Sequence, residues 1–228
     1  MNRSIVTRLV AKDLYFYRWL IAIAVLVGFA SIALMGVGPG DSVKTGMNLG
    51  VILFMTDVIA LGIFIVMFGL FKERQDKSLL FVLSLPVSPM QYGIAKVASA
   101  LIAFLVPWAV LTAATIALTA ASDGAPDGAI PAFAAMMTFF LANFCLLLAL
   151  VLVTQSERWA IAGILVTNTA VPAFLGVLYR LPDIAAHQQS TTAVWSTTAL
   201  TIIAVAVAAA ALSLGTALYI QSRRRDFV

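Results

Sequence analysis

Six apolar segments, each about as long as a bilayer is thick, constrain this chain more than any other feature of its sequence. A helix needs about 20 mainly apolar residues to cross the hydrocarbon core of a membrane. Six segments reach this length and are separated by charged or turn-forming residues: 19–38, 51–71, 97–121, 130–153, 159–179 and 199–220. The sequence therefore predicts an all-α, polytopic membrane protein with six transmembrane helices in one domain over residues 1–228.

The composition excludes a water-soluble domain. Hydrophobic residues make up 62% of the chain and charged residues only 11%, whereas soluble domains carry about 25% charged residues. The formal net charge of +4 comes from basic residues beside the apolar segments, which argues against nucleic acid as a partner. Cys145 is the only cysteine, so an intrachain disulfide is excluded and a buried structural thiol is expected.

The distribution of Lys and Arg predicts the orientation, because these residues favour the cytoplasmic side of a membrane. Only Lys44 and Arg180 fall on one predicted side. The other predicted side holds the remaining basic residues: Arg3, Arg8, Lys12, Arg18, Lys72, Arg74, Lys77, Lys96, Arg158, Arg223, Arg224 and Arg225. We therefore expect both termini in the cytoplasm, an inner-membrane location, and a first apolar segment retained as an anchor because it is too long for a signal-peptide core.

Residues 1–18 have the pattern of an amphipathic helix. Apolar residues fall on one broad face, and basic and small polar residues fall on the other, while Asp13 and Arg3 interrupt the apolar side. This pattern predicts an interfacial helix on the inner leaflet, with its basic residues toward lipid headgroups and cytosol. Such a helix serves either as a simple anchor or also as a contact for a cytoplasmic partner.

Residues 72–96 form the longest predicted loop on the basic side, and a loop of this length in a small protein is usually functional. It opens with alternating charges, continues through an apolar-edged segment that is too short to span a membrane, and breaks at Pro86 and Pro89. Two interpretations remain open. The segment is either a coupling helix that passes motion between a soluble motor and the membrane helices, or a surface helix packed on the bundle.

Residues 71–88, followed by Gly93 and Lys96, resemble the signature region of ABC-2 type transporter permeases. That family shows a Glu-Arg start, a Gly-Thr-Leu-like step, a Leu-Leu-Ser-x-Pro-Val-Ser stretch and a Gly-x-x-Lys entering the next helix. Here Lys77-Ser78 replaces the usual Gly-Thr, so the local turn differs. The broader resemblance covers the whole chain, with its N-terminal interfacial helix, six spans, cytoplasmic ends and long first cytoplasmic loop.

The resemblance implies a type V exporter fold, in which two six-helix permeases pair, either as a homodimer or with a related sibling. Each permease would dock a separate nucleotide-binding subunit, which holds ATP and Mg, while this chain binds no cofactor. The resemblance assigns the coupling contacts to one group of loop residues: Glu73, Arg74, Ser78, Leu79, Leu80 and Leu83. It also implies short helices dipping into the membrane between the last two spans, over residues 180–198.

Three polar residues inside predicted spans are candidates for a transport path. Asp57 is the one formal charge well inside a span, where a carboxylate is costly. It either lines a water-accessible outer vestibule or is a hydrogen-bonded structural acid. Asn143 and Asn168 lie near the middles of the fourth and fifth spans, where amides often join helices and could also contact cargo.

No catalytic or metal-binding motif accompanies these features. The chain lacks a phosphate-binding G-x-x-x-x-G-K-[ST] pattern and an H-E-x-x-H pattern, and its one histidine, His187, lies in a predicted external loop. We expect a transport permease rather than an enzyme, with an amphipathic, peptide or lipid-like cargo because few charges face inward. Two alternatives stay open: a membrane-embedded enzyme acting on lipids, and a non-catalytic scaffold or immunity protein.

Overall fold

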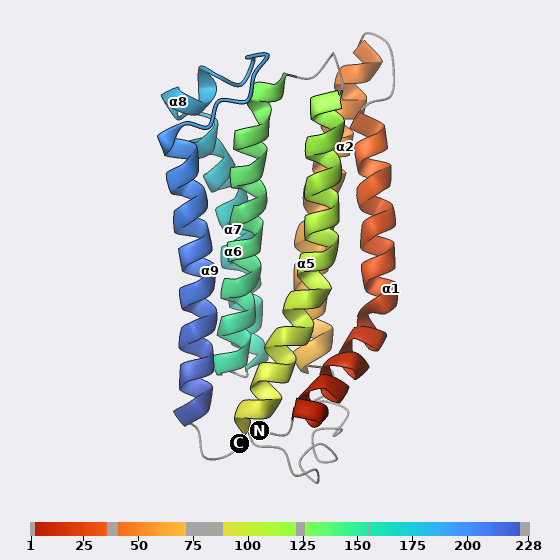
Figure 1. Ribbon diagram of the computed structural model, residues 1–228, viewed down its shortest axis with the longest axis vertical. Coiled ribbons are helices and arrows are strands. Elements are labelled where there is room, and N and C mark those ends of the chain that lie inside the picture. The colour runs from red at the N-terminus through yellow and green to blue at the C-terminus, as the bar shows by residue number, and fades with distance from the viewer. Residues whose placement is uncertain (1–2, 36–40, 72–88, 122–125, 155, 224–228) are drawn as a thin grey trace.

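Long helices that run side by side form a bundle in the computed structural model, which describes residues 3–35, 41–71, 89–121, 126–154 and 156–223 (Figure 1). Six of the helices in this described part are long and apolar enough to cross a membrane. No described residue belongs to a β-strand. The predicted all-α class with six membrane-spanning helices is confirmed, and the length and composition of these helices indicate a multi-pass membrane protein.

The helix bounds agree with the predicted spans to within a few residues at most ends. The elements are α1 (Arg3–Met35), α2 (Asp41–Val66) continued by the π-helical turn η1 (Met67–Phe71), α5 (Pro89–Ala121), the 3-10 turn η2 (Asp127–Ala129), α6 (Ile130–Thr154), α7 (Glu157–Leu178), the four-residue α8 (Pro182–Ala185) and α9 (Thr197–Arg223). The predicted loop 180–198, which the resemblance implies to carry dipping helices, contains the short helix α8 and the first residues of α9.

The described residues of the predicted interfacial helix at 1–18 and of the predicted first span at 19–38 belong to one helical element in the structure. Residues 3–35 form one continuous helix, and its first part leans toward the start of α5 (Figure 1). A buried stripe that includes Asp13, Tyr17 and Ala24 faces the neighbouring helices on both sides of the boundary between the two predicted segments. Asp13 therefore does not interrupt a lipid-facing surface.

The predicted loop 72–96 is also too long at its C-terminal end. Helix α5 begins at Pro89, where proline is favoured because the first helical residue needs no amide donor. Residues 89–96 are therefore helical, and Lys96, predicted as a loop cation, is a buried helix residue that is 6% exposed.

The bundle consists of two groups of three helices. In the first group α1 packs on α2 and α5, and in the second group α6 packs on α9 and α7. Helix α6 is the central element, since most of its residues are buried. It meets the first group through a stacked Phe104–Phe144 pair, with ring centroids 4.1 Å apart, and through the Trp108 indole N–H, which donates to the Met137 carbonyl at 2.8 Å.

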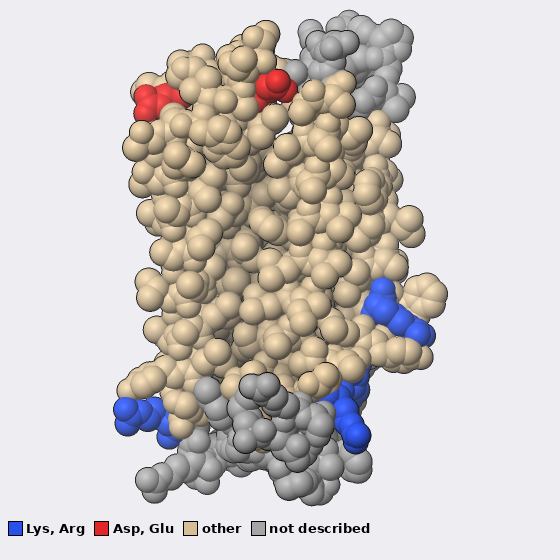
Figure 2. Space-filling model, in the orientation of Figure 1, with Lys and Arg blue, Asp and Glu red and all other residues tan. Residues whose placement is uncertain are grey.

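The two ends of the bundle differ in charge. The described chain begins and ends at the same end, where α2 and its η1 turn end and α5 begins (Figure 1). In the view of Figure 2, the visible Lys and Arg side chains lie toward this end, and the visible Asp and Glu side chains lie at the opposite end. We name the two ends the basic end and the acidic end.

Residues 179–196 form a cap over the ends of α6, α7 and α9 at the acidic end (Figure 1). The Gly128 amide donates to the Ser190 carbonyl at 3.0 Å, and the Ser190 amide donates to the His187 carbonyl at 3.0 Å. A methyl group on Gly128 would overlap the His187 backbone carbonyl. The close approach of the cap to η2 therefore requires glycine at this position.

We expect Gly128→Ala to lower the free energy of unfolding by about 1–3 kcal/mol, the usual cost of overpacking. Gly176→Ala is the matched control, because a methyl group there has no atom within 4 Å and alanine favours the helix by up to about 1 kcal/mol. Thermal unfolding of both variants in detergent measures the difference. Equal midpoints for the two variants would contradict the close contact between Gly128 and the cap.

Candidate functional site

A buried ion pair joins α1 to α5 near the basic end. The Lys96 ammonium donates to Oδ2 of Asp13 at 2.9 Å, and the Ser99 hydroxyl donates to the same oxygen at 3.0 Å. All three residues are buried, and the Tyr92 ring centroid lies 5.7 Å from the Lys96 ammonium. Because each charge would be strongly destabilising alone in this environment, the pair fixes the register of α1 on α5.

One turn further along α1, Tyr17 contacts the end of α2. Its hydroxyl donates to the Ile65 carbonyl at 3.4 Å, and it occupies the space that a methyl group on Gly69 would need. Gly69 belongs to η1, the π-helical turn that ends this element, and such turns often occur at functional sites. The phenol of Tyr17 therefore packs directly on the backbone of η1.

In the sequence, the residues of these two contacts flank the segment 72–88. Gly69 comes just before this segment and Lys96 comes soon after it, while Asp13 and Tyr17 are neighbours on one face of α1. We name the four residues the loop-flank contacts. The predicted coupling residues themselves lie outside the described part of the chain: Glu73, Arg74, Ser78, Leu79, Leu80 and Leu83.

Prediction from sequence missed the loop-flank contacts. The available signals were an acid on the apolar side of the N-terminal segment, Asp13, and a lysine one turn inside an apolar helix, Lys96. A charged side chain on an apolar face predicts a buried partner. The pattern does not say which of the basic residues is that partner.

A small cavity lies between the two helix groups. It has a volume of about 30 Å³, room for roughly one or two water molecules. Residues of α2, α5, α6 and α7 line it: Val58, Ile59, Gly62, Ile63, Phe104, Phe140, Asn143, Phe144, Leu147, Thr167, Asn168 and Val171. In this conformation the space is too small for a peptide or a lipid.

The cavity brings together two of the three predicted path residues, Asn143 and Asn168. The Asn143 amide donates to the Thr167 carbonyl at 3.3 Å and so joins α6 to α7. The Asn168 amide donates to the Ile164 carbonyl of its own helix at 2.9 Å. Both asparagines lie about halfway along their helices, so the polar part of this largely apolar cavity lies near the middle of the bundle.

Asp57, the third predicted path residue, does not line the cavity, although the next residue, Val58, does. Its Oδ2 atom is buried and has no hydrogen-bond partner among the described residues. It lies about 12 Å along the helix from Leu49, where the apolar part of α2 begins. Both interpretations of Asp57, a residue of a water-accessible vestibule or a hydrogen-bonded structural acid, stay predictions.

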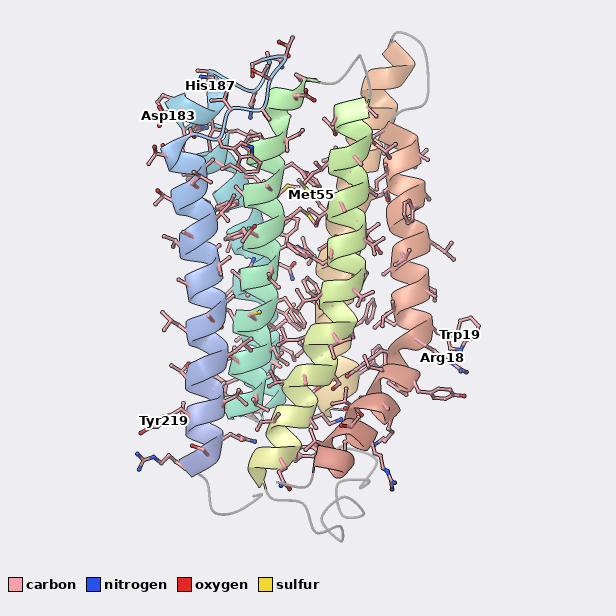
Figure 3. The ribbon with its side chains drawn as sticks, in the orientation of Figure 1. Arg18, Trp19, Met55, Asp183, His187 and Tyr219 are labelled. Atoms are coloured by element: carbon pink, nitrogen blue, oxygen red, sulfur yellow. The ribbon has the colours of Figure 1, made fainter. Side chains whose placement is uncertain are left out.

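The acidic end holds the one histidine, His187, whose Nδ1 atom contacts a backbone carbonyl rather than a carboxylate. Nδ1 of His187 lies 2.8 Å from the Asp183 backbone carbonyl, and the Asp183 carboxylate instead accepts from the Thr198 hydroxyl. Both residues lie in the cap (Figure 3). Within the described ranges, no three His, Cys, Asp or Glu side chains are grouped to hold a metal ion.

No protein-family model, curated protein or solved structure matches the chain. The resemblance of residues 71–96 to ABC-2 permeases therefore stays a prediction.

We expect the ion pair to show strong coupling in a double-mutant cycle. Asp13→Leu alone or Lys96→Met alone leaves one buried charge without its partner and should cost about 3–5 kcal/mol of unfolding free energy. The double variant should cost less than either single variant, because no unpaired charge remains. Unfolding in mixed detergent micelles measures all four proteins, and additive losses would contradict a direct Asp13–Lys96 interaction.

Gly69→Ala should destabilise the protein by about 1–3 kcal/mol, because the added methyl group overlaps the Tyr17 phenol. Tyr17→Phe removes the overlapping hydroxyl, so the variant carrying both changes should recover part of this loss. Gly215→Ala is the control, since a methyl group at that position has no neighbour within 4 Å. Thermal unfolding tests the rescue, and a larger loss for the combined variant would refute the packing of Tyr17 on Gly69.

Proposed function

We propose that the chain is the transmembrane permease subunit of an ATP-binding cassette exporter. A separate subunit would bind and hydrolyse ATP with Mg, and this chain would move a cargo out of the cytoplasm. Two supports come from the sequence: the six apolar spans without any nucleotide-binding pattern, and the resemblance of residues 71–96 to ABC-2 permeases. The distribution of Lys and Arg supports a cytoplasmic position for the basic end.

The observation that carries this proposal is the set of loop-flank contacts. A partner that pushes on residues 72–88 acts on the end of α2 and the start of α5, the two elements that this segment connects. Tyr17 packs on the first of these ends, and Asp13 forms the buried ion pair with the second. Force applied to the segment would therefore reach all three helices of the first group together.

A movement of the first helix group would change the size of the cavity. It lies between the two helix groups, so a displacement of α2 and α5 relative to α6 and α7 would widen it. Asn143, Thr167 and Asn168 would then offer polar groups near the middle of the membrane, the depth at which many transporters bind their substrates. The apolar remainder of the lining favours an amphipathic, peptide or lipid-like cargo over a small charged solute.

A second permease completes the proposed assembly, because exporters of the resembled family work as pairs of six-helix subunits. The outer helices α7 and α9 offer wide apolar faces, with Leu165, Val166, Val205 and Leu212 more than half exposed. Lipid covers such a face in a single permease, and a second copy or a related sibling would cover part of it in the pair.

The proposal is tested by purification of the tagged chain from native membranes in mild detergent. We expect a P-loop ATPase to co-purify with the wild type. Glu73→Ala/Leu80→Arg/Leu83→Arg should reduce its recovery at least about tenfold, since a few central contacts carry most of an interface's affinity. Ala186→Arg/Gln189→Arg is the control, because it adds the same two arginines at exposed positions in the cap.

Unchanged thermal unfolding of the triple variant shows that it still folds. Loss of the ATPase from the triple variant alone supports the permease function and the coupling segment. If no ATPase accompanies even the wild type, the exporter proposal fails, and a lipid-acting enzyme or a scaffold becomes the better interpretation. Equal loss in both variants would contradict the assignment of residues 72–88 as the docking segment.

A further inference from the structure

Exposed arginines lie beside aromatic residues on three helices, α1, α7 and α9, toward the basic end. The pairs are Arg18 with Trp19 on α1, Arg158 with Trp159 on α7, and Arg223 with Tyr219 on α9. In Figure 3, Arg18 and Trp19 point outward from α1, and Tyr219 points outward from α9. Tyr and Trp favour the depth of lipid headgroups, which indicates that a membrane surface lies toward this end of the bundle. Arg18 and Trp19 lie farther from the basic end than Tyr219 (Figure 3), so the headgroup region covers a range of depths here.

The length of α7 supports this placement. Exposed aromatic residues mark both of its ends, Trp159 toward the basic end and Tyr179 toward the acidic end. The helix rises about 30 Å between them, at 1.5 Å per residue, and this equals the thickness of a hydrocarbon core. Arg158, next to Trp159, therefore lies at the depth of lipid phosphates, and the long side chain of Arg18 can reach this depth from a position farther inside.

One of the three pairs has the features of a binding site. Cζ of Arg18 lies 3.8 Å from the centroid of the Tyr15 ring and 5.6 Å from that of Trp19. A guanidinium carries five N–H donors in a planar fork that suits a bidentate acceptor such as phosphate. Tyr15 and Trp19 therefore hold this cation beside their rings on the surface of α1.

The N-terminal part of the exposed face of α1 adds positive charge near Arg18. Arg8, Lys12, Tyr15 and Trp19 follow the i, i+4, i+7, i+11 spacing of one helix face, and all are exposed. The one acidic residue in the α1 sequence, Asp13, is buried in the ion pair with Lys96. Beyond Trp19 the exposed residues Ile23 and Leu26 are apolar. The face is therefore cationic, then aromatic, then aliphatic, which matches the headgroup, the interface and the acyl chains of a lipid.

We propose that Arg18, flanked by Tyr15 and Trp19 and supported by Arg8 and Lys12, binds the phosphate of an anionic phospholipid. The acyl chains of this lipid lie along Ile23 and Leu26. Bidentate recognition of phosphate by a guanidinium and attraction of anionic lipid to clustered basic residues supply the affinity. This site is independent of the transport proposal, because it requires only that the bundle spans a membrane.

The test is a titration of the detergent-purified full chain with phosphatidylglycerol, followed by native mass spectrometry. Arg18→Gln should weaken the first lipid-binding step about five- to tenfold, the effect expected for one cation at a membrane surface. Arg158→Gln is the matched control. It removes the same charge beside a tryptophan at the same end, but Glu157 precedes it, so we expect a change of less than about twofold.

Three outcomes would overturn the proposal. The first is equal weakening by the two substitutions, which would reflect net charge alone. The second is equally tight binding of phosphatidylcholine, which would show that the anionic headgroup is not recognised. The third is displacement of the lipid by millimolar glycerol phosphate, which would indicate a site for free anions. Arg18 is exposed, so Arg18→Gln should keep the wild-type unfolding midpoint, and this measurement separates lost binding from lost folding.

Discussion

The ion pair between Asp13 and Lys96 is the interaction on which the arrangement of the first helix group depends. The two residues are 83 positions apart in the chain, and the pair is buried with Ser99 as a further donor to the carboxylate. Apolar packing alone leaves the sliding and rotation of membrane helices weakly specified, since lipid is as apolar as the side chains. A buried charge tolerates almost no displacement from its partner, so the ion pair sets the position of α1 on α5.

The second helix group is held together by different means. Its centre is the nearly all-apolar helix α6, which packs on α9 and on α7, the latter through the stacked rings of Phe139 and Phe174. Fewer specific contacts join the two groups, and the polar cavity lies among them. The bundle therefore combines two well-joined groups with a boundary that holds water-sized space, an arrangement suited to movement of one group against the other.

Much of the fold was predictable from the sequence, because a lipid environment leaves few alternatives to apolar helices of fixed length. The predicted spans 97–121 and 130–153 share their C-terminal end with α5 and their N-terminal start with α6, respectively. The continuity of α1 was missed, since its first turns look interfacial until Asp13 and Tyr17 are seen to contact α5 and α2.

The candidate site was less predictable. Asn143 and Asn168 were identified because amides in the middle of apolar spans are unusual, but their meeting in one cavity depends on how α6 and α7 pack. Asp57 was predicted on the same path and lies outside the cavity lining. Helix α2 is apolar on nearly every side, so its sequence does not specify which face turns toward α6.

The most direct measurement is a pair of spin-label distance distributions in lipid nanodiscs, with Cys145 replaced by alanine. One label pair, at Ala11 and Ile102, reports on α1 and α5, and the other, at Leu146 and Leu212, reports on α6 and α9; all four positions are exposed. If the ion pair holds α1 on α5, Asp13→Asn should broaden the first distribution and leave the second unchanged. A first distribution that stays narrow in Asp13→Asn would contradict the central role of this ion pair.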